Sequence, residues 1–187
     1  MKVVVGLGNP GAEYAATRHN VGFRVAEAFA AAHGIPLRRS GSLALAGRGT
    51  VAGEEVWVAE PLTMMNRSGA AIRHLLRESG GDAASLVVVH DDLDLPFGRL
   101  RFKRRGGPGG HNGVRSIIEV LETDAFLRLR AGIGRPAPGA DPVDYVLEPF
   151  AADERRTVSA MIEAACEALR VALTDGVTTA MNRFHAS

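Results

Sequence analysis

An uninterrupted apolar run, LVVVH at residues 86–90, is the feature that most constrains the fold of this chain. A strand that is apolar on both faces must be covered on both faces, as strands are in parallel sheets flanked by helices. The run leads directly into the polar turn DDLDLP at 91–96. We therefore expect a central strand at 86–90 in an α/β sheet, with an acidic turn at its carboxyl end.

The rest of the chain alternates between strand-like and helix-like segments. Apolar patterns predict further strands at 2–7, 43–51, 56–60, 99–104 and 126–133. Helical spacing of apolar residues predicts helices at 21–33, 68–79, 113–122 and about 158–169, with a short one at 176–185. We therefore expect a single α/β domain over residues 1–187, with a twisted, mixed but mostly parallel sheet and helices on both faces. The Pro/Gly-rich stretch at 135–142 is expected to be a surface loop.

Composition limits the class of protein. A chain of 187 residues with 46% hydrophobic content can bury a core without disulfides or a structural metal. The single cysteine, Cys166, falls in an apolar-periodic stretch, which is typical of a buried thiol. The apolar run at the amino end is too short for a signal peptide or a membrane span. We expect a cytoplasmic protein with no membrane partner.

Positive charge is concentrated in one part of the chain. The net charge of +1 excludes a polycation that binds DNA or RNA indiscriminately, yet nine basic and three acidic residues between Arg99 and Arg135 give a local charge of +6. Six of the basic residues recur at every second position, opposite leucine and phenylalanine, on two predicted strands. They are Arg99, Arg101, Lys103, Arg105, Arg128 and Arg130. A solvated face is the alternative, but the nearly unbroken positive sign favours contact with the phosphates of a folded RNA.

The glycines of GLGNPG at 6–11 have the spacing of a dinucleotide-binding fingerprint. That fingerprint also requires a helix opening at its third glycine and an acidic residue ending a second strand about 20 positions later. Here Pro10 and a polar run to Asn20 delay the helix, and the region of the expected acid is still helical. The context does not favour nucleotide binding.

Two titratable residues lie where a predicted sheet would place its ligand crevice. His19 precedes the first helix in the polar loop ATRHN, and Asp91 follows the most buried strand. An imidazole can transfer protons near neutral pH, and a carboxylate can orient it and stabilise its charged form. The alternatives are a loop histidine without a role and an acidic turn that only ends the strand. A metal site at 90–94 fits poorly, because Pro96 replaces the fifth ligand of a calcium loop.

Three asparagines also fall at element ends: Asn9, Asn66 and Asn112. Carboxamides can hold or polarise an ester carbonyl without competing for the proton. Each alone is more often a cap or turn residue. One sheet edge could bring all three together with His19 and Asp91.

The motifs GLGNPG, Y-x-x-T-RHN-x-G, MNRSG, HDDLDLPFG and GGPGGHNG, followed by TDGVTTAMNRFH, resemble the bacterial peptidyl-tRNA hydrolase family in order and spacing. The resemblance covers almost the whole chain. It implies an α/β esterase that needs no cofactor or metal, works as a monomer, and detaches peptides from tRNA in translation.

The resemblance also implies residue roles. His19 would act as general base, Asp91 would hold its basic form, and Asn9 would distinguish N-blocked peptidyl chains from free aminoacyl groups. The substrate-contacting positions would be Tyr14, Met64, Asn66 and Asn112, and tRNA phosphates would contact Lys103, Arg105 and Arg130.

Two positions depart from the family pattern, which often has phenylalanine at position 64 and a small or polar residue at 108. Methionine supplies similar apolar contact, so we expect at most a change in affinity for the tRNA 3′ end. Three rival functions remain open: a non-catalytic, splicing-factor-like RNA-binding relative, a nucleotide-dependent enzyme, and an esterase for small substrates.

Overall fold

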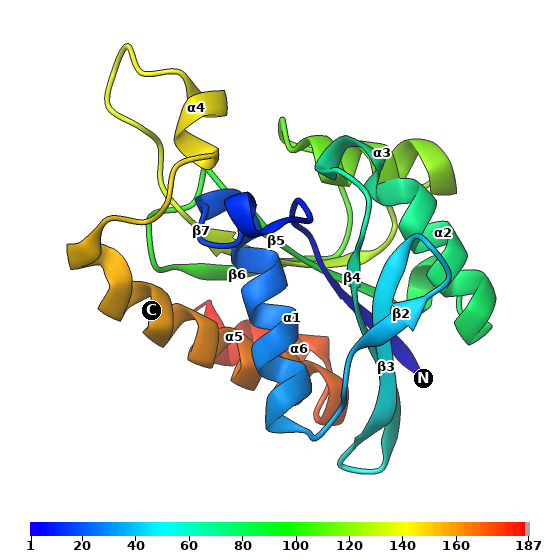
Figure 1. Cartoon of the computed structure of the whole chain (residues 1–187). Helices are drawn as coiled ribbons and strands as arrows, with labels where there is room; N and C mark the ends of the chain where they lie inside the picture. Colours follow the sequence, from blue (N-terminus) through cyan, green and yellow to red (C-terminus); the bar gives the residue numbers. More distant parts are fainter. Residues whose placement is uncertain (186–187) are drawn as a thin grey trace.

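The computed structural model describes residues 1–185 and is built on one seven-stranded sheet of order β2-β3-β4-β1-β5-β7-β6 (Figure 1). The strands are β1 (Lys2–Gly6), β2 (Arg38–Ser40), β3 (Ala44–Val51), β4 (Glu54–Pro61), β5 (Leu86–Asp92), β6 (Leu100–Lys103) and β7 (Leu127–Gly132). The helices are α1 (Val21–Ala32), α2 (Ser68–Ser79), α3 (Asn112–Leu121), α4 (Pro142–Val146), α5 (Arg155–Thr174) and α6 (Val177–Phe184).

The sheet is parallel in its centre and antiparallel at its edges. Strands β4, β1, β5 and β7 are parallel neighbours, while the pairings β2–β3 and β3–β4 on one side and β6–β7 on the other are antiparallel. Parallel strands bring their carboxyl ends to the same edge, so the loops after β1 and β5 lie together there. The predicted mixed, mostly parallel sheet is confirmed.

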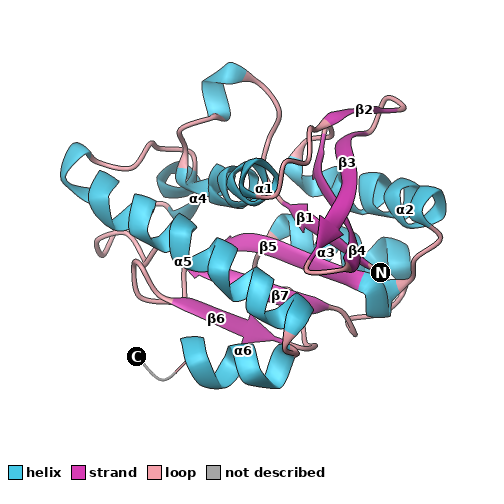
Figure 2. Cartoon of the chain, turned by 90° about the horizontal axis from the view of Figure 1, so that it is seen from below, coloured by secondary structure: helices cyan, strands magenta, loops and turns pink. Residues whose placement is uncertain are grey.

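Helices cover both faces of this sheet. In β1, Val4 packs into a core with α1, α5 and α6, whereas Val3 and Val5 face the opposite core with α2 and α3. Figure 2 shows α5 and α6 across the β7–β6 part of the sheet, which they contact. The alternation of side chains along a strand explains why the apolar residues 86–89 of β5 are buried on both sides.

Gly6 of the GLGNPG motif and Gly22 of α1 allow this helix to pack closely against the sheet. A Cβ on Gly6 would lie 2.0 Å from the carbonyl oxygen of Gly22, and a Cβ on Gly22 would lie 2.5 Å from the carbonyl oxygen of Val89. Helix α1 can therefore approach the ends of β1 and β5 only because both positions lack a side chain. The close approach brings the start of α1, and with it His19, to the carboxyl end of β5.

Two short elements were not predicted. Strand β2 has no alternating apolar pattern and forms only by pairing with β3. Helix α4 follows the predicted 135–142 loop, and its start had a readable signal: the Asp141 side chain accepts the N–H of Val143, and Pro142 occupies the first turn. No helix within residues 1–185 is both long and apolar enough to cross a membrane.

Candidate active site

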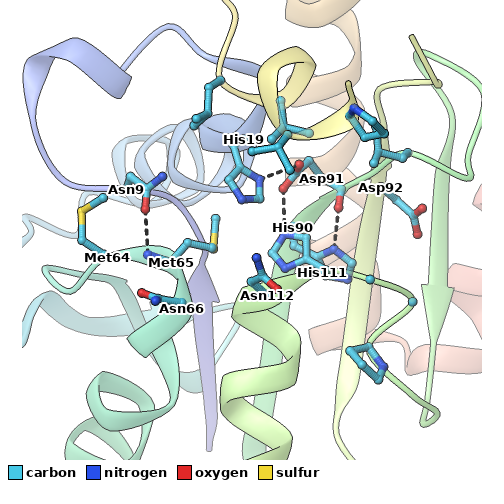
Figure 3. Close-up of a pocket in the computed structure, with 18 of the residues that line it drawn as sticks. Asn9, His19, Met64, Met65, Asn66, His90, Asp91, Asp92, His111 and Asn112 are labelled. Carbon is cyan, nitrogen blue, oxygen red and sulfur yellow. Dashed lines mark hydrogen bonds and ion pairs between the residues drawn. The ribbon is translucent and has the colours of Figure 1, made fainter. Parts of the chain in front are cut away.

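A cavity of about 530 Å³ opens at the carboxyl edge of the sheet. Its walls come from four parts of the chain: the loop after β1, the segment before α2, the turn after β5, and the glycine-rich loop before α3, with α4 at its mouth (Figure 3). Asn9, His19, Asn66, Asp91 and Asn112 all line it. The predicted gathering of these side chains at one sheet edge is confirmed.

His19 and Asp91 form a hydrogen-bonded pair in this cavity. His19 lies in a 3₁₀ turn at Arg18–Asn20, directly before α1, and Asp91 ends the buried part of β5. The imidazole Nδ1 is 2.8 Å from Asp91 Oδ2. The predicted contact between residues 72 positions apart is confirmed. Since an ionised carboxylate can only accept, His19 donates through Nδ1–H, and in the neutral ring Nε2 carries the lone pair.

A second imidazole, His111, binds the other oxygen of Asp91. Its Nε2 lies 2.9 Å from Asp91 Oδ1. Its Nδ1 accepts the backbone N–H groups of Gly113 at 3.1 Å and Val114 at 3.3 Å, which caps α3. Backbone amides only donate, so the proton of His111 must reside on Nε2 and point at Asp91. The helix cap therefore fixes the tautomer of His111.

The pKa shifts follow from this arrangement. Burial alone would raise the pKa of Asp91, but the charges and hydrogen bonds of His19 and His111 outweigh it and hold that pKa well below its usual range. Burial works to lower the pKa of His19, yet the Asp91 carboxylate outweighs burial and leaves the pKa above 6.5. Burial lowers the pKa of His90 to about 3, so this ring stays neutral against His111.

The side-chain amide of Asn9 is held through its oxygen atom, and its NH₂ group stays available. The side chain of Asn20 binds the Asn9 backbone at both its N–H (2.8 Å) and its carbonyl oxygen (2.9 Å). The Asn9 Oδ1 accepts the N–H of Met65 at 2.7 Å. The amide NH₂ of Asn9 makes no hydrogen bond to residues 1–185, and it faces the cavity on the side of His19 (Figure 3). This group can donate to a bound carbonyl.

The remaining predicted substrate positions differ in placement. Met64 and Asn66 line the cavity from the segment before α2, and Met64 is 43% exposed. Asn112 opens α3, and its Oδ1 accepts from Arg115, which leaves its NH₂ available. Tyr14 is half-buried in a 3₁₀ turn at Ala12–Tyr14 and is not part of the cavity wall.

The basic side chains do not form one continuous face. Arg130 is partly buried and binds Asp92 at 3.2 Å, and the exposed Arg105 lies 3.6 Å from Asp124. Lys103 is partly buried on β6. The expectation that Arg128 belongs to this face is wrong: its side chain is 1% exposed and donates to backbone carbonyl groups. Strand alternation predicted the side on which Arg128 lies, but not that a loop covers that side.

His19, Asp91 and His111 also form a group whose possible ligand atoms lie within 4.8 Å of one another. A cation bound there would have to replace both imidazole–carboxylate hydrogen bonds. Protonated nitrogens directed at a carboxylate are not available as metal ligands. The donor set fits a hydrogen-bonded array rather than a metal centre.

A family model described as peptidyl-tRNA hydrolase matches residues 3–187. The chain belongs to the peptidyl-tRNA hydrolase family. It is 46% identical over 185 residues to the peptidyl-tRNA hydrolase of Syntrophotalea carbinolica, covering 99% of this chain and 97% of the relative. The counterpart from Symbiobacterium thermophilum is 47% identical over 186 residues, covering 98% of each. The crystal structure of peptidyl-tRNA hydrolase from Acinetobacter baumannii superposes with a TM-score of 0.93 at 36% identity, covering 100% of this chain and 95% of that one.

For this member of the peptidyl-tRNA hydrolase family, sequence reasoning missed two residues that build the site. One is His111, the neighbour of Asn112; a histidine directly before a predicted helix, at the ligand edge of the sheet, is a signal that the sequence does contain. Asn20 acts on the backbone of Asn9 and is 1% exposed. Such a contact cannot be read from spacing, because it depends on how the loop folds back on itself.

Proposed function

We propose that this chain hydrolyses the ester bond between a peptide, or another N-blocked aminoacyl group, and the 3′-terminal ribose of tRNA. The reaction would recycle tRNA from prematurely released peptidyl-tRNA. Family membership supports the reaction class. The observation that carries the proposal is the His19–Asp91 pair, which uses Nδ1 of the imidazole and leaves its Nε2 without a hydrogen-bond partner within residues 1–185, in an open cavity.

In the proposed mechanism, neutral His19 removes a proton from water through Nε2, and the water oxygen attacks the ester carbonyl carbon. Asp91 holds the ring and stabilises the imidazolium that forms. Collapse of the tetrahedral intermediate breaks the bond to the ribose oxygen, which takes the proton back from His19. The products are a free peptide carboxylate and a ribose hydroxyl.

Three amides surround the space in which the carbonyl would lie. Asn66 or Asn112 would donate to the developing oxyanion, since each lines the cavity with an NH₂ that has no partner within residues 1–185. The free NH₂ of Asn9 would bind the carbonyl of the N-blocking group, which a free aminoacyl group lacks. An ester is already activated, so positioning and proton transfer suffice without a cofactor.

The tRNA would be held by its phosphates. The proposed phosphate contacts lie on or directly after β6 and β7: Lys103, Arg105 and Arg130. Arg130 pairs with Asp92, which lines the cavity, so this basic region adjoins the cavity wall. We further propose that the protein works in the cytoplasm as a monomer. Charge reversal of Lys103 and Arg105 should weaken tRNA binding and flatten its salt dependence. Unchanged affinity would reassign these residues to a solvated surface.

The decisive experiment compares wild-type protein and His19→Ala on N-acetylaminoacyl-tRNA and on free aminoacyl-tRNA. We expect turnover of the N-blocked substrate alone, and its loss in His19→Ala with the melting temperature preserved. His33→Ala, a change in a histidine at the far end of α1, is the matched control. Turnover that survives in His19→Ala would remove His19 from the mechanism. An inactive wild-type protein that still binds tRNA would support the RNA-binding alternative.

A further inference from the structure

Arg128 is a buried arginine for which neither the mechanism nor the basic face accounts. It lies on β7, between β5 and β6, and its side chain is 1% exposed. Its guanidinium group stacks over Phe126, with the carbon 4.4 Å from the ring centroid. No carboxylate within residues 1–185 lies at ion-pair distance from it; its hydrogen-bond partners are two backbone carbonyl oxygens. Burying a guanidinium group without a carboxylate partner is costly, so we expect this side chain to have a structural role.

The two carbonyl groups flank α3. One terminal nitrogen donates to Gly107, in the glycine-rich loop before the helix, at 2.9 Å. The other donates to Asp124, in the turn after the helix, at 2.7 Å. The planar guanidinium group thus connects both ends of the segment 107–124 to the central sheet. Arginine suits this task because its fixed fork reaches two acceptors at once.

The loop that Arg128 holds has little conformational preference of its own. Gly106, Gly109 and Gly110 have φ values of 131°, 58° and 84°, which side-chain-bearing residues rarely adopt. Within residues 1–185, the backbone of 106–110 accepts a single hydrogen bond from the sheet, which Arg128 donates to the carbonyl oxygen of Gly107, and one inside the loop, which the N–H of His111 donates to Pro108. The position of the loop therefore depends on the guanidinium group.

This loop ends at His111, whose Nε2–H binds Asp91 at 2.9 Å, and at Asn112 on the cavity wall. A shift of the loop would lengthen that hydrogen bond and move both side chains relative to His19. We infer that Arg128 is a positioning residue of the active site, which fixes His111 and Asn112 by clamping the two ends of α3. The inference builds on the proposed hydrolysis, but the clamp itself can be measured without turnover.

The kinetic test uses Arg128→Lys and Arg128→Ala, with Arg73→Lys on the exposed face of α2 as the matched control. A misplaced site costs up to roughly 100-fold in rate, so we expect kcat on N-acetylaminoacyl-tRNA to fall about 10- to 100-fold in both variants. KM and the salt dependence of tRNA binding should stay unchanged, because Arg128 contacts no phosphate. Lysine should not rescue the rate, since one ammonium group cannot bridge both carbonyls. Guanidinium ion at millimolar concentration should raise kcat in Arg128→Ala but not in His19→Ala.

The structural test follows the imidazole N–H signals of ¹⁵N-histidine-labelled protein by NMR. The Nε2–H of His111 should give a protected signal in wild-type protein, and this signal should broaden or vanish in Arg128→Lys. If wild-type protein shows no turnover but the NMR change occurs, the proposed function fails and the clamp stands. Wild-type kcat with an unchanged His111 signal in folded Arg128→Lys would overturn the inference. A flatter salt dependence with unchanged kcat would also overturn it and make Arg128 a phosphate contact.

Discussion

Replacing Asp91 with asparagine should reverse the tautomer of His19. The two carboxylate oxygens accept from two imidazoles, at 2.8 Å from His19 and at 2.9 Å from His111. Asparagine has one acceptor oxygen and one NH₂. His111 must donate through Nε2, because its Nδ1 caps α3, so the oxygen of the introduced asparagine will turn to His111. The NH₂ of that asparagine then faces His19 Nδ1, and the His19 proton moves to Nε2, the atom that has to act as base.

The magnitude follows from the cost of the opposite orientation. Turning the asparagine oxygen back to His19 sets its NH₂ against His111 Nε2–H, which leaves two buried donors without acceptors. Each costs about 1–3 kcal/mol, so the basic tautomer is disfavoured by about 2–6 kcal/mol. At about 1.4 kcal/mol per factor of ten, kcat/KM should fall roughly 30- to 20,000-fold.

The assay is single-turnover hydrolysis of N-acetylaminoacyl-tRNA, with Asp153→Asn at an exposed position as the control. The double variant Asp91→Asn with His111→Ala gives the sharper result. Removing His111 frees the asparagine oxygen to accept from His19, so the double variant should be more active than Asp91→Asn alone. Single-variant activity close to wild type would refute the tautomer argument. So would a double variant whose loss equals the product of the two single losses.

Two further predictions concern pH. Because Asp91 raises the pKa of His19 and the base must be neutral, kcat/KM should fall as pH drops through that raised pKa, and this limb should move to lower pH in Asp91→Asn; an unmoved limb would contradict the assignment. On the other side of Asn9, burial and the nearby Glu27 raise the pKa of Glu60 to about 8. A raised carboxyl pKa means that stability is lost as pH rises from about 4.5 to 8, by a few kcal/mol. Glu60→Gln should therefore raise the melting temperature at pH 9 but not at pH 4. The control Glu54→Gln, at an exposed position on the same strand, should leave the melting temperature unchanged at both pH values.

The fold could be predicted from sequence because its main features are local. The continuous apolar run of β5 and the alternation of strands with helices define a sheet covered on both faces, and the structure has that sheet. Helix α4 and strand β2 were missed for different reasons. The start of α4 is marked in the sequence by Asp141 and Pro142, but the surrounding Pro/Gly-rich stretch is typical of a loop. Strand β2 owes its conformation to its neighbour β3, and no local pattern shows that.

The site was predictable to the extent that it lies at the ends of elements. His19 and Asp91 follow from the rule that loops at the carboxyl edge of parallel strands meet. The roles of three further residues depend on tertiary contacts between loops and the sheet: His111, Asn20 and Arg128. The periodicity of apolar residues along the sequence does not show such contacts. Arg128 and Arg130 share a face of β7, yet a loop covers the first, while the second lies beside the cavity and binds Asp92.

The protonation states of the side chains around the end of β5 leave His19 as the one group that can act as general base. His90 donates its Nδ1–H to the backbone carbonyl of Asp91 and is kept neutral by burial. His111 is fixed as the Nε2–H tautomer by α3, and Asp91 stays ionised between two donors. Of these four side chains, His19 alone combines a ring nitrogen without a partner within residues 1–185 with a pKa that burial lowers but Asp91 raises further. A single base of this kind suits attack by water on an ester, because the base must first accept the proton of the water and then return it to the leaving ribose oxygen.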